Sequence, residues 1–196
     1  MSVLFLGPDC KPITDFLREL GHKVILCEEP IDVNFLDAAK PDFGVSYKYR
    51  HIVKKPVIDW FSGRLINLHI SYLPWNRGAD PNLWSFLTKT PSGVTIHVMD
   101  GGLDTGPILA QREVVHDLEK DTLESSYSRL SLAMENLFME YFGAIIKGQI
   151  LPRPQSKQKG SFHMLADKTQ FEPFWAQKGW QTPLKEIWGK GVPHGQ

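Results

Sequence analysis

Short apolar runs alternate with helical patterns along the first 50 residues, and this alternation restricts the possible folds more than any other feature of the chain. Residues 3–6, 23–27 and 43–47 are apolar runs of strand length, and residues 13–20 repeat apolar side chains at helical spacing. Residues 33–39 fit a second short helix. Strands separated by helices pair in parallel through crossover connections. The pattern therefore predicts an α/β fold with a mostly parallel sheet and helices on both of its faces.

The same kind of pattern continues to about residue 148. We expect helices over residues 56–61 and 82–87, and strands over residues 65–70, 93–99 and 108–115. A long helix follows and ends near Lys147. Its start has a capping-box pattern formed by Asp121 and Glu124.

The composition changes after Gly148. Residues 149–161 are rich in Pro, Gln, Lys, Gly and Ser, which is typical of a loop. The remaining residues, 162–196, have no clear periodicity and contain Trp175, Trp180 and Trp188. We predict a catalytic domain over residues 1–150 and, over residues 151–196, a loop and extension packed on or beside it. We expect the tryptophans to cover the core, and contact with a partner is the alternative.

Charge and composition argue against several classes of function. The chain has 22 basic and 22 acidic residues, so it lacks the basic excess of proteins that bind nucleic acids through the phosphate backbone. Its first apolar run is too short for a signal peptide, and no segment approaches the roughly 18 apolar residues of a membrane span. Cys10 and Cys27 fit buried free thiols in a reducing compartment. We therefore expect a cytoplasmic protein with no nucleic-acid and no membrane partner.

Polar side chains alternate with apolar ones in the predicted strand around Asn67 and His69. Residues two apart on a strand point to the same face, so these two side chains project together. A carboxamide beside an imidazole offers two donors that can point at one developing oxyanion. The alternative interpretation is a coincidental polar stripe on a half-exposed strand.

Two loops strengthen the interpretation of this strand as part of a site. Residues 71–81 follow it directly, and ligands of open α/β sheets bind beyond the carboxyl ends of the strands. Residues 100–107 surround Asp104 with three glycines and a proline, which favours a tight backbone path close to a ligand. Each loop also has a simpler interpretation. Residues 71–81 could be a solvated surface loop, and residues 100–107 could be a hairpin connection between two strands.

The order of these motifs resembles the folate-dependent formyltransferases, over roughly residues 1–150. The motifs are Asn67-x-His69, Ser71-x-Leu73-Pro74, Arg77-Gly78, Gly93-Val94-Thr95-Ile96-His97 and Leu103-Asp104-Thr105-Gly106. The resemblance implies the formyltransferase fold, a Rossmann-like twisted sheet. Residues 46–50 and 73–81 look most similar to the branch that formylates nucleotide-linked amino sugars, a reaction of surface-glycan synthesis.

The resemblance implies a catalytic trio of Asn67, His69 and Asp104, and no metal. Asn67 and His69 would donate hydrogen bonds to the oxyanion that forms when an amine attacks the formyl carbon. Asp104 would hold His69 charged and oriented, and would take up the proton of the amine directly or through water. We expect His97 to have a structural role near the site.

The resemblance also indicates where the formyl donor, 10-formyltetrahydrofolate, would bind. One side of the pterin pocket would be formed by Arg50, His51, Ile52, Val53 and Ile58. The loop that closes its other side would include Met99, Asp100, Gly101 and Gly102. For the apolar members of the first group, a place in the hydrophobic core is the alternative.

A nucleotide-linked amino sugar is the expected acceptor, and the protein is expected to be a monomer or a homodimer. The side chains predicted to bind the acceptor are Lys48, Tyr72, Trp75, Asn76 and Arg77. Glycinamide ribonucleotide is less favoured, because prolines in residues 7–12 remove backbone donors that cradle phosphate. The short segment after Gly148 and the neutral charge argue against an aminoacyl-tRNA acceptor.

Two other classes of function remain open, a hydrolase and a non-catalytic module. A formyltetrahydrofolate hydrolase would use the same trio with water in place of the amine, although such enzymes carry an additional N-terminal domain that this sequence does not show. A non-catalytic folate-binding or assembly module would not need the complete trio. A dinucleotide-dependent dehydrogenase is disfavoured, because no Gly-x-Gly-x-x-Gly motif follows a strand.

Overall fold

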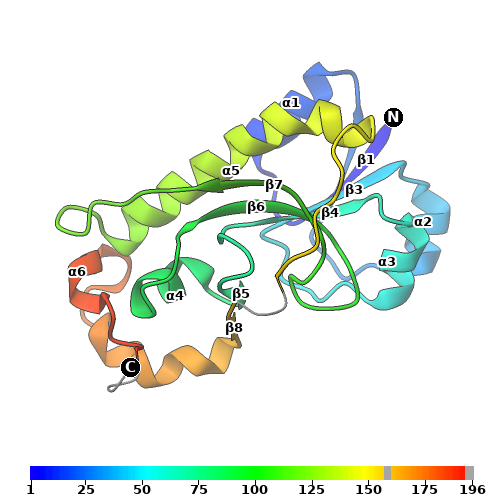
Figure 1. Ribbon diagram of the computed structural model, residues 1–196. Coiled ribbons are helices and arrows are strands. Elements are labelled where there is room, and N and C mark those ends of the chain that lie inside the picture. Colours follow the sequence, from blue (N-terminus) through cyan, green and yellow to red (C-terminus); the bar gives the residue numbers. More distant parts are fainter. Residues whose placement is uncertain (157–159, 193–196) are drawn as a thin grey trace. The chain divides into compact units, whose positions relative to one another are not determined.

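The main sheet has six strands in the order β2-β1-β3-β4-β6-β7 (Figure 1), and the computed structural model describes residues 1–156 and 160–192. The strands are β1 (Ser2–Leu6), β2 (Lys23–Cys27), β3 (Phe43–Tyr47), β4 (Leu65–His69), β6 (Gly93–Val98) and β7 (Ile108–Glu113). The pairs β1–β2, β1–β3 and β3–β4 are parallel. The predicted α/β fold with a mostly parallel sheet is confirmed.

The helices of the first half are α1 (Lys11–Glu19), α2 (Val33–Ala39), α3 (Lys55–Phe61) and α4 (Pro81–Leu87), and the long helix is α5 (Leu123–Ile146). The limits predicted for β2, α2 and β3 are those of the structure, and the other predicted elements of the first 150 residues differ by one or two residues at their ends, whereas the short strand β5 (Arg77–Gly78) was not predicted. These elements divide by proximity into two compact units. Unit 1 comprises residues 1–69, 96–110 and 135–155, and unit 2 comprises residues 70–95, 111–134 and 156–196.

In unit 1, helices cover both faces of the sheet. Leu4 and Leu6 of β1 pack with Leu36 of α2 and with Val57 and Phe61 of α3 in one buried cluster. On the other face, the ring of Phe142 in α5 contacts Phe16 of α1 at 6.3 Å and Phe43 of β3 at 6.1 Å between centroids. Successive residues of a strand point to opposite faces, so the continuous apolar runs of β1 and β3 bury both sides of the sheet.

Unit 2 contains its own hydrophobic core, built around α4. Leu83, Trp84, Phe86 and Leu87 pack against Leu123 of α5 and against Leu184 and Ile187 of α6 (Leu184–Ile187). Two 3-10 helices, η1 (Leu165–Phe174) and η2 (Gly179–Gln181), precede α6. The tail that sequence patterns left unassigned thus folds onto α4, within unit 2.

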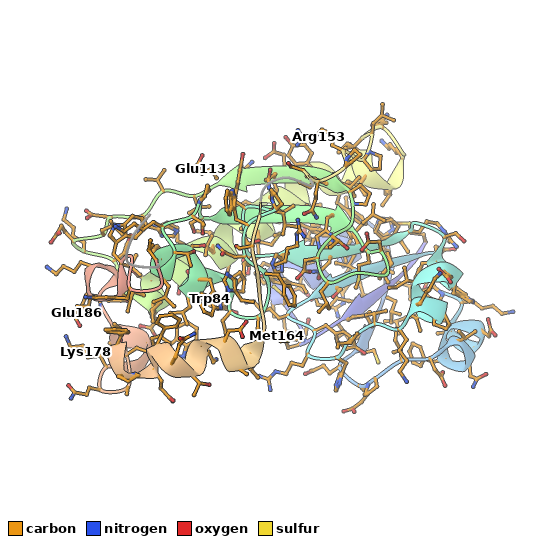
Figure 2. The ribbon with its side chains drawn as sticks, turned by 60° about the horizontal axis from the view of Figure 1, so that its bottom comes forward. Trp84, Glu113, Arg153, Met164, Lys178 and Glu186 are labelled. Carbon is orange, nitrogen blue, oxygen red and sulfur yellow. The ribbon has the colours of Figure 1, made fainter. Side chains whose placement is uncertain are left out.

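A second, two-stranded sheet in unit 2 joins β5 (Arg77–Gly78) to β8 (Phe162–His163) in parallel. His163 also stacks on Trp84, with 3.8 Å between ring centroids and 5° between planes (Trp84 is labelled in Figure 2). The units interleave along the chain and do not coincide with the segments 1–150 and 151–196, so that division stays a prediction.

The three tryptophans of the tail do not behave alike. Trp175 packs against the α4 core, as expected for a side chain that covers it. Trp180 is 57% exposed and contacts Tyr127 edge-on at 5.3 Å, and Trp188 is 37% exposed. The expectation of a covering role therefore holds for Trp175.

The start of α5 corrects one sequence prediction. The reciprocal capping bonds join Thr122 and Ser125, whose side chains each accept from the other's backbone N–H at 3.0 and 3.2 Å. Asp121 instead accepts from the hydroxyl of Ser125 at 2.9 Å and from the guanidinium of Arg129 at 2.8 and 2.9 Å. The predicted capping box of Asp121 and Glu124 was therefore wrong by one residue. Asp121 and Thr122 are both of a type that can cap a helix, but the carboxylate of Asp121 binds Arg129, and Thr122 forms the capping bonds.

Candidate active site

Two of the predicted catalytic side chains lie on β4, between β3 and β6 in the sheet. Asn67 is opposite Ser46 in the parallel register, and His69 is the last residue of the strand. Ile66 and Leu68 are buried. The alternation along β4 therefore directs the carboxamide and the imidazole to one face, at the carboxyl end of the sheet.

The third side chain, Asp104, lies in a tight loop between β6 and β7 with a backbone φ of +53°. The carboxylate of Asp100 closes the first half of the loop, because its Oδ1 accepts from the backbone N–H of Gly102 at 3.1 Å and from the hydroxyl of Thr105 at 2.7 Å. Gly106 passes so close to the carbonyl of Val98 that a Cβ at this position would overlap it. The loop thus has little freedom, and it holds Asp104 in a left-handed conformation that Asp tolerates better than most residues.

The structure brings the three groups together within unit 1. The amide nitrogen of Asn67 donates to Oδ1 of Asp104 at 3.0 Å, and Nδ1 of His69 lies 3.6 Å from Oδ2 of the same carboxylate. The side chains of His69 and Asp104 are 9% and 14% exposed. One carboxylate thus contacts the carboxamide through one oxygen and faces the imidazole with the other, in a largely desolvated place where electrostatic effects are strong.

His97 is a fourth member of this cluster. It is 2% exposed, and its Nδ1 lies 3.0 Å from the carbonyl oxygen of Val98, which can only accept, so Nδ1 carries a hydrogen. Its Nε2 lies 3.3 Å from the amide nitrogen of Asn67 and 3.4 Å from Oδ1 of Asp104. In the neutral ring Nε2 accepts from Asn67, so both amide hydrogens of Asn67 have acceptors. The structural role expected for His97 is therefore to orient the amide of Asn67.

The residues predicted to line the pterin pocket also lie in unit 1. Val53 belongs to the buried cluster of β1, α2 and α3, and Ile58 and Met99 pack against that cluster. Ile52 is 76% exposed, and Arg50 and His51 are exposed as well. Asp100, Gly101 and Gly102 form the first half of the Asp104 loop. The structure thus brings Val53, Ile58 and Met99 together, while Ile52 does not have the core position that was the alternative for it.

The residues predicted to bind the acceptor belong to unit 2, apart from Lys48. Tyr72, Trp75 and Arg77 are partly buried. Asn76 is fully buried with a φ of +55°, and its amide donates to the hydroxyls of Ser85 at 3.0 Å and Thr90 at 2.8 Å. These bonds give Asn76 a structural task in shaping the loop.

Lys48 follows β3 in unit 1. Its backbone has a φ of +57°, and its Nζ lies 4.8 Å from the centroid of the Tyr47 ring.

In unit 2, the Nε atom of Arg77 is buried, with no hydrogen-bond partner among residues 1–156 and 160–192. A buried guanidinium nitrogen of this kind is rare and costs stability.

The segment around β8 was absent from the sequence interpretation of the acceptor loop. Ser161 accepts from the backbone N–H of Asn76 at 2.8 Å and donates to its side-chain oxygen at 3.0 Å. The backbone N–H groups of Arg77 and Ala79 donate to the carbonyls of Ser161 and His163 at 3.0 and 2.9 Å. A two-residue strand in a tail without periodicity gives no sequence signal, so these contacts could not be found from patterns.

Among residues 1–156 and 160–192, no group of three or more His, Cys, Asp or Glu side chains could hold a metal ion. Within the same residues no helix has the length and apolar character that crossing a membrane requires.

A carboxamide, an imidazole and a carboxylate that converge at the end of a central strand form the arrangement needed for transfer at a carbonyl carbon. Residues 27–141 match the formyl transferase family, and the chain belongs to this family. The resemblance inferred from the motifs is confirmed.

Solved structures extend the comparison to the whole chain. The formyltransferase PseJ from Anoxybacillus kamchatkensis, solved with UDP-4,6-dideoxy-4-formamido-L-AltNAc and tetrahydrofolate, is 46% identical with a TM-score of 0.93. The match covers 97% of this chain and 100% of that chain. A 4-N formyltransferase from Francisella tularensis has a TM-score of 0.73 at 22% identity, over 86% of this chain and 78% of that chain, and shares the fold.

Curated sequence relatives include methionyl-tRNA formyltransferases. The enzyme of Thermodesulfovibrio yellowstonii is 36% identical over 154 residues, which are 76% of this chain and 49% of the relative. That of Geobacillus thermodenitrificans is 34% identical over 154 residues, 77% of this chain and 47% of the relative. The chain thus spans about half the length of the curated relatives it matches.

Proposed function

We propose that this protein transfers the formyl group of 10-formyltetrahydrofolate to the primary amine of a nucleotide-linked amino sugar. The observation that carries the proposal is the 46% identity with PseJ over nearly the full length of both chains, since PseJ was solved with a formylated nucleotide sugar and tetrahydrofolate. The convergence of Asn67, His69 and Asp104 supports it, because these groups suit attack of an amine on a formyl carbon.

Asn67 and His69 stabilise charge in this proposal. A bond forms between the acceptor nitrogen and the formyl carbon, and negative charge develops on the formyl oxygen. With Nδ1–H of His69 directed at Asp104, the other ring nitrogen, Nε2, donates to that oxygen when the ring is an imidazolium. A hydrogen of the Asn67 amide provides the second bond once it leaves its internal acceptor. Removal of one such donor typically lowers turnover on the order of 100- to 1,000-fold.

Asp104 manages the proton. The amine must attack in its neutral form, and its nitrogen carries a surplus proton after the new bond has formed. The carboxylate accepts this proton directly or through a water molecule, and a proton is returned to the folate nitrogen as its bond to the formyl carbon breaks. The short distances from Asp104 to Asn67 and to the imidazole place the carboxylate where it can also orient both donors.

The residues around Ile52 fit a folate ring system. The donor supplies an activated formyl group, and the protein has to bind a flat, partly apolar ring with a hydrogen-bonding edge. Ile52 is an exposed apolar side chain directly before the buried Val53, and Met99 packs against the same cluster. An exposed isoleucine beside a core cluster is a suitable apolar wall, and Gly101 has open space where a Cβ would stand, which allows close approach to its backbone.

Within unit 2, the loop from Tyr72 to Arg77 is proposed to bind the acceptor. Its aromatic rings offer flat surfaces for a base, and the guanidinium of the partly exposed Arg77 is proposed to donate to a phosphate oxygen. A cytoplasmic location, where folates and nucleotide sugars are made, fits this proposal.

An aminoacyl-tRNA is the second candidate acceptor, because the curated relatives that match include methionyl-tRNA formyltransferases. Two observations favour the sugar. The identity with PseJ is higher and covers all of that chain, whereas these matches cover about half of each relative. The formal net charge of zero also offers no excess of cations for a polyanionic tRNA.

The test is an assay of the purified protein with 10-formyltetrahydrofolate and a panel of amines. The panel contains UDP- and dTDP-linked sugars with a 4-amino or a 3-amino group, glycinamide ribonucleotide, and methionyl-tRNA. A sample without any amine measures formate release by hydrolysis. Mass spectrometry detects the added formyl group, and absorbance follows tetrahydrofolate formation.

Turnover of a nucleotide-linked amino sugar that exceeds that of the other amines supports the proposal. Efficient formylation of methionyl-tRNA, with no sugar in the panel reacting, would overturn it. Formate release that does not depend on an amine would instead identify a hydrolase.

A further inference from the structure

The Asp104 loop depends on a residue far away in the sequence. Asp100 and Thr105 close the first half of this loop, but the backbone carbonyls of Asp104 and Gly106 need donors from elsewhere. Gln155 supplies both, because its Nε2 donates to Asp104 O at 2.7 Å and to Gly106 O at 2.8 Å. All three residues belong to unit 1.

The orientation of the Gln155 amide follows from these partners. Backbone carbonyl oxygens only accept, so the nitrogen and not the oxygen of the carboxamide must face them. An amide nitrogen has two hydrogens, and each has one acceptor here. Gln155 therefore bridges the backbone carbonyls of Asp104 and Gly106 and fixes the backbone on both sides of Thr105.

The backbone around Gln155 is held to the same loop. Arg153, labelled in Figure 2, forms an antiparallel bridge with Ile108, with N–H to O distances of 2.7 and 2.8 Å. In the register of this bridge, Gln155 lies opposite Gly106. This position brings the amide of Gln155 within reach of the two carbonyls. Residues 153–155 thus form an extended segment that runs along the end of the Asp104 loop.

The oxygen of the same amide shows that this position is not optimised for stability. Gln155 Oε1 is buried and has no hydrogen-bond partner among residues 1–156 and 160–192. Buried acceptors without a donor are rare and cost stability, and an apolar side chain at this position would avoid that cost. The glutamine is best explained by what its nitrogen does for the loop.

We infer that Gln155 is a positioning residue for the formyl transfer, acting through Asp104. It holds the Asp104 backbone so that one carboxylate reaches both Asn67 and His69. The inference rests on the proposed function, because it assigns a task to Asp104. Displacement of a reacting group by about 1 Å costs on the order of 100-fold in rate, so loss of this link should affect turnover strongly.

The main test compares Gln155→Leu and Gln155→Glu with the wild type. The leucine removes both donors without a charge, and the glutamate places a carboxylate against two carbonyl oxygens. We expect kcat to fall by roughly 10- to 100-fold, more for Gln155→Glu, while KM for the acceptor changes by less than about threefold. Gln149→Leu and Gln149→Glu are the matched controls, because Gln149 is exposed in the same connecting segment.

A double-mutant comparison separates positioning from general support of the fold. In the Asp104→Asn background the residue that Gln155 positions no longer works as a base, so Gln155→Leu should lower kcat little further. A merely structural residue would lower kcat by the same factor in both backgrounds. Equal factors, or a wild-type kcat in Gln155→Leu, would overturn the inference.

A measurement without turnover distinguishes failure of this inference from failure of the proposed function. Backbone amide and imidazole NMR signals report on the Asp104 loop and on His69 whatever the acceptor is. We expect the signals of residues 102–106 and of the His69 ring to shift in Gln155→Leu and to stay in place in Gln149→Leu. Unchanged signals would contradict the inference, even if no amine in the panel reacts. Should Gln155→Leu not fold, the same spectra of Gln155→Asn, which is one methylene too short to reach, decide the question.

Discussion

The amide nitrogen of Asn67 lies 3.3 Å from Nε2 of His97, a ring whose other nitrogen is fixed by the carbonyl of Val98. The neutral ring therefore accepts one hydrogen of Asn67 while Asp104 accepts the other. His97 thus determines how the carboxamide is oriented and whether it can release a hydrogen to substrate.

Replacement of His97 by leucine tests this relationship. The change removes one neutral hydrogen bond, worth about 1 kcal/mol, and a factor of ten corresponds to about 1.4 kcal/mol. We therefore expect kcat to fall roughly fivefold, less than the 100- to 1,000-fold expected for Asn67→Ala. Steady-state kinetics with saturating donor gives both values. A loss in His97→Leu as large as that in Asn67→Ala would mean that the ring acts on the reacting atoms themselves.

Substitutions of Asp104 should separate chemistry from backbone strain. Asp104→Asn keeps a residue that tolerates the φ of +53°, while Asp104→Ala adds a strain of about 1–2 kcal/mol. Both remove the carboxylate, and we expect kcat to fall by about 100- to 10,000-fold in each. Urea denaturation should show the lower stability in Asp104→Ala. Near-normal turnover in Asp104→Asn would remove the carboxylate from the mechanism.

His116 should make the stability of the protein depend on pH. Burial, with a smaller effect of Arg129, lowers the pKa of His116 from its ordinary value of 6.5 to about 4. The ring is neutral in the folded protein and protonated in the unfolded chain between these values, so the unfolded state binds more protons there. The contribution to stability is thus complete above pH 6.5 and is lost as the pH falls towards 4.

The measurement is the free energy of unfolding of wild type and His116→Gln at pH 4.5 and pH 7. The wild type should lose more stability than the variant between these two values. Asp121, His22 and His163 also titrate with lowered pKa values, but they contribute to both proteins and cancel in the comparison. Parallel losses in the two proteins would contradict the assignment to His116.

Asn76 should be important for stability. Its buried amide has partners in Ser85, Thr90 and Ser161. Asn76→Ala removes the side-chain bonds to Ser85, Thr90 and Ser161 and places alanine at a positive φ, so we expect a loss of about 2–3 kcal/mol. Ser161→Ala should cost less, about 1 kcal/mol. Thermal unfolding followed by circular dichroism measures both, and an Asn76→Ala protein of unchanged stability would refute the structural role.

Much of the first half of the fold could be predicted from sequence, because burial and local structure agree there. The strands β2 and β3 are apolar runs of strand length, and α2 starts at Val33 directly after Asp32, whose side chain caps it by accepting from Phe35 N–H at 2.9 Å. The tail could not be predicted, since its short elements depend on partners such as Trp84 that are distant in sequence. Cys10 and Cys27, expected to be buried, are partly exposed.

The site was predictable to different degrees. The period of a strand is enough to place Asn67 and His69 on one face. Asp104 came from resemblance to a family, because its position depends on how a glycine-rich loop folds back. Gln155 gave no signal, since a glutamine in a proline-rich loop acquires its role only through the antiparallel register of Arg153 and Ile108.

The pairing of β5 with β8 has a consequence for the order in which the molecule forms. All six strands of the main sheet lie within residues 2–113, whereas the contact between Asn76 and Ser161 joins residues 85 positions apart. Contacts over such separations form slowly, because the intervening chain must first be ordered. A growing polypeptide that has not yet reached residue 160 would therefore contain every strand of the large sheet. The loop bearing Trp75 and Arg77 would still lack its contacts with Ser161 and β8.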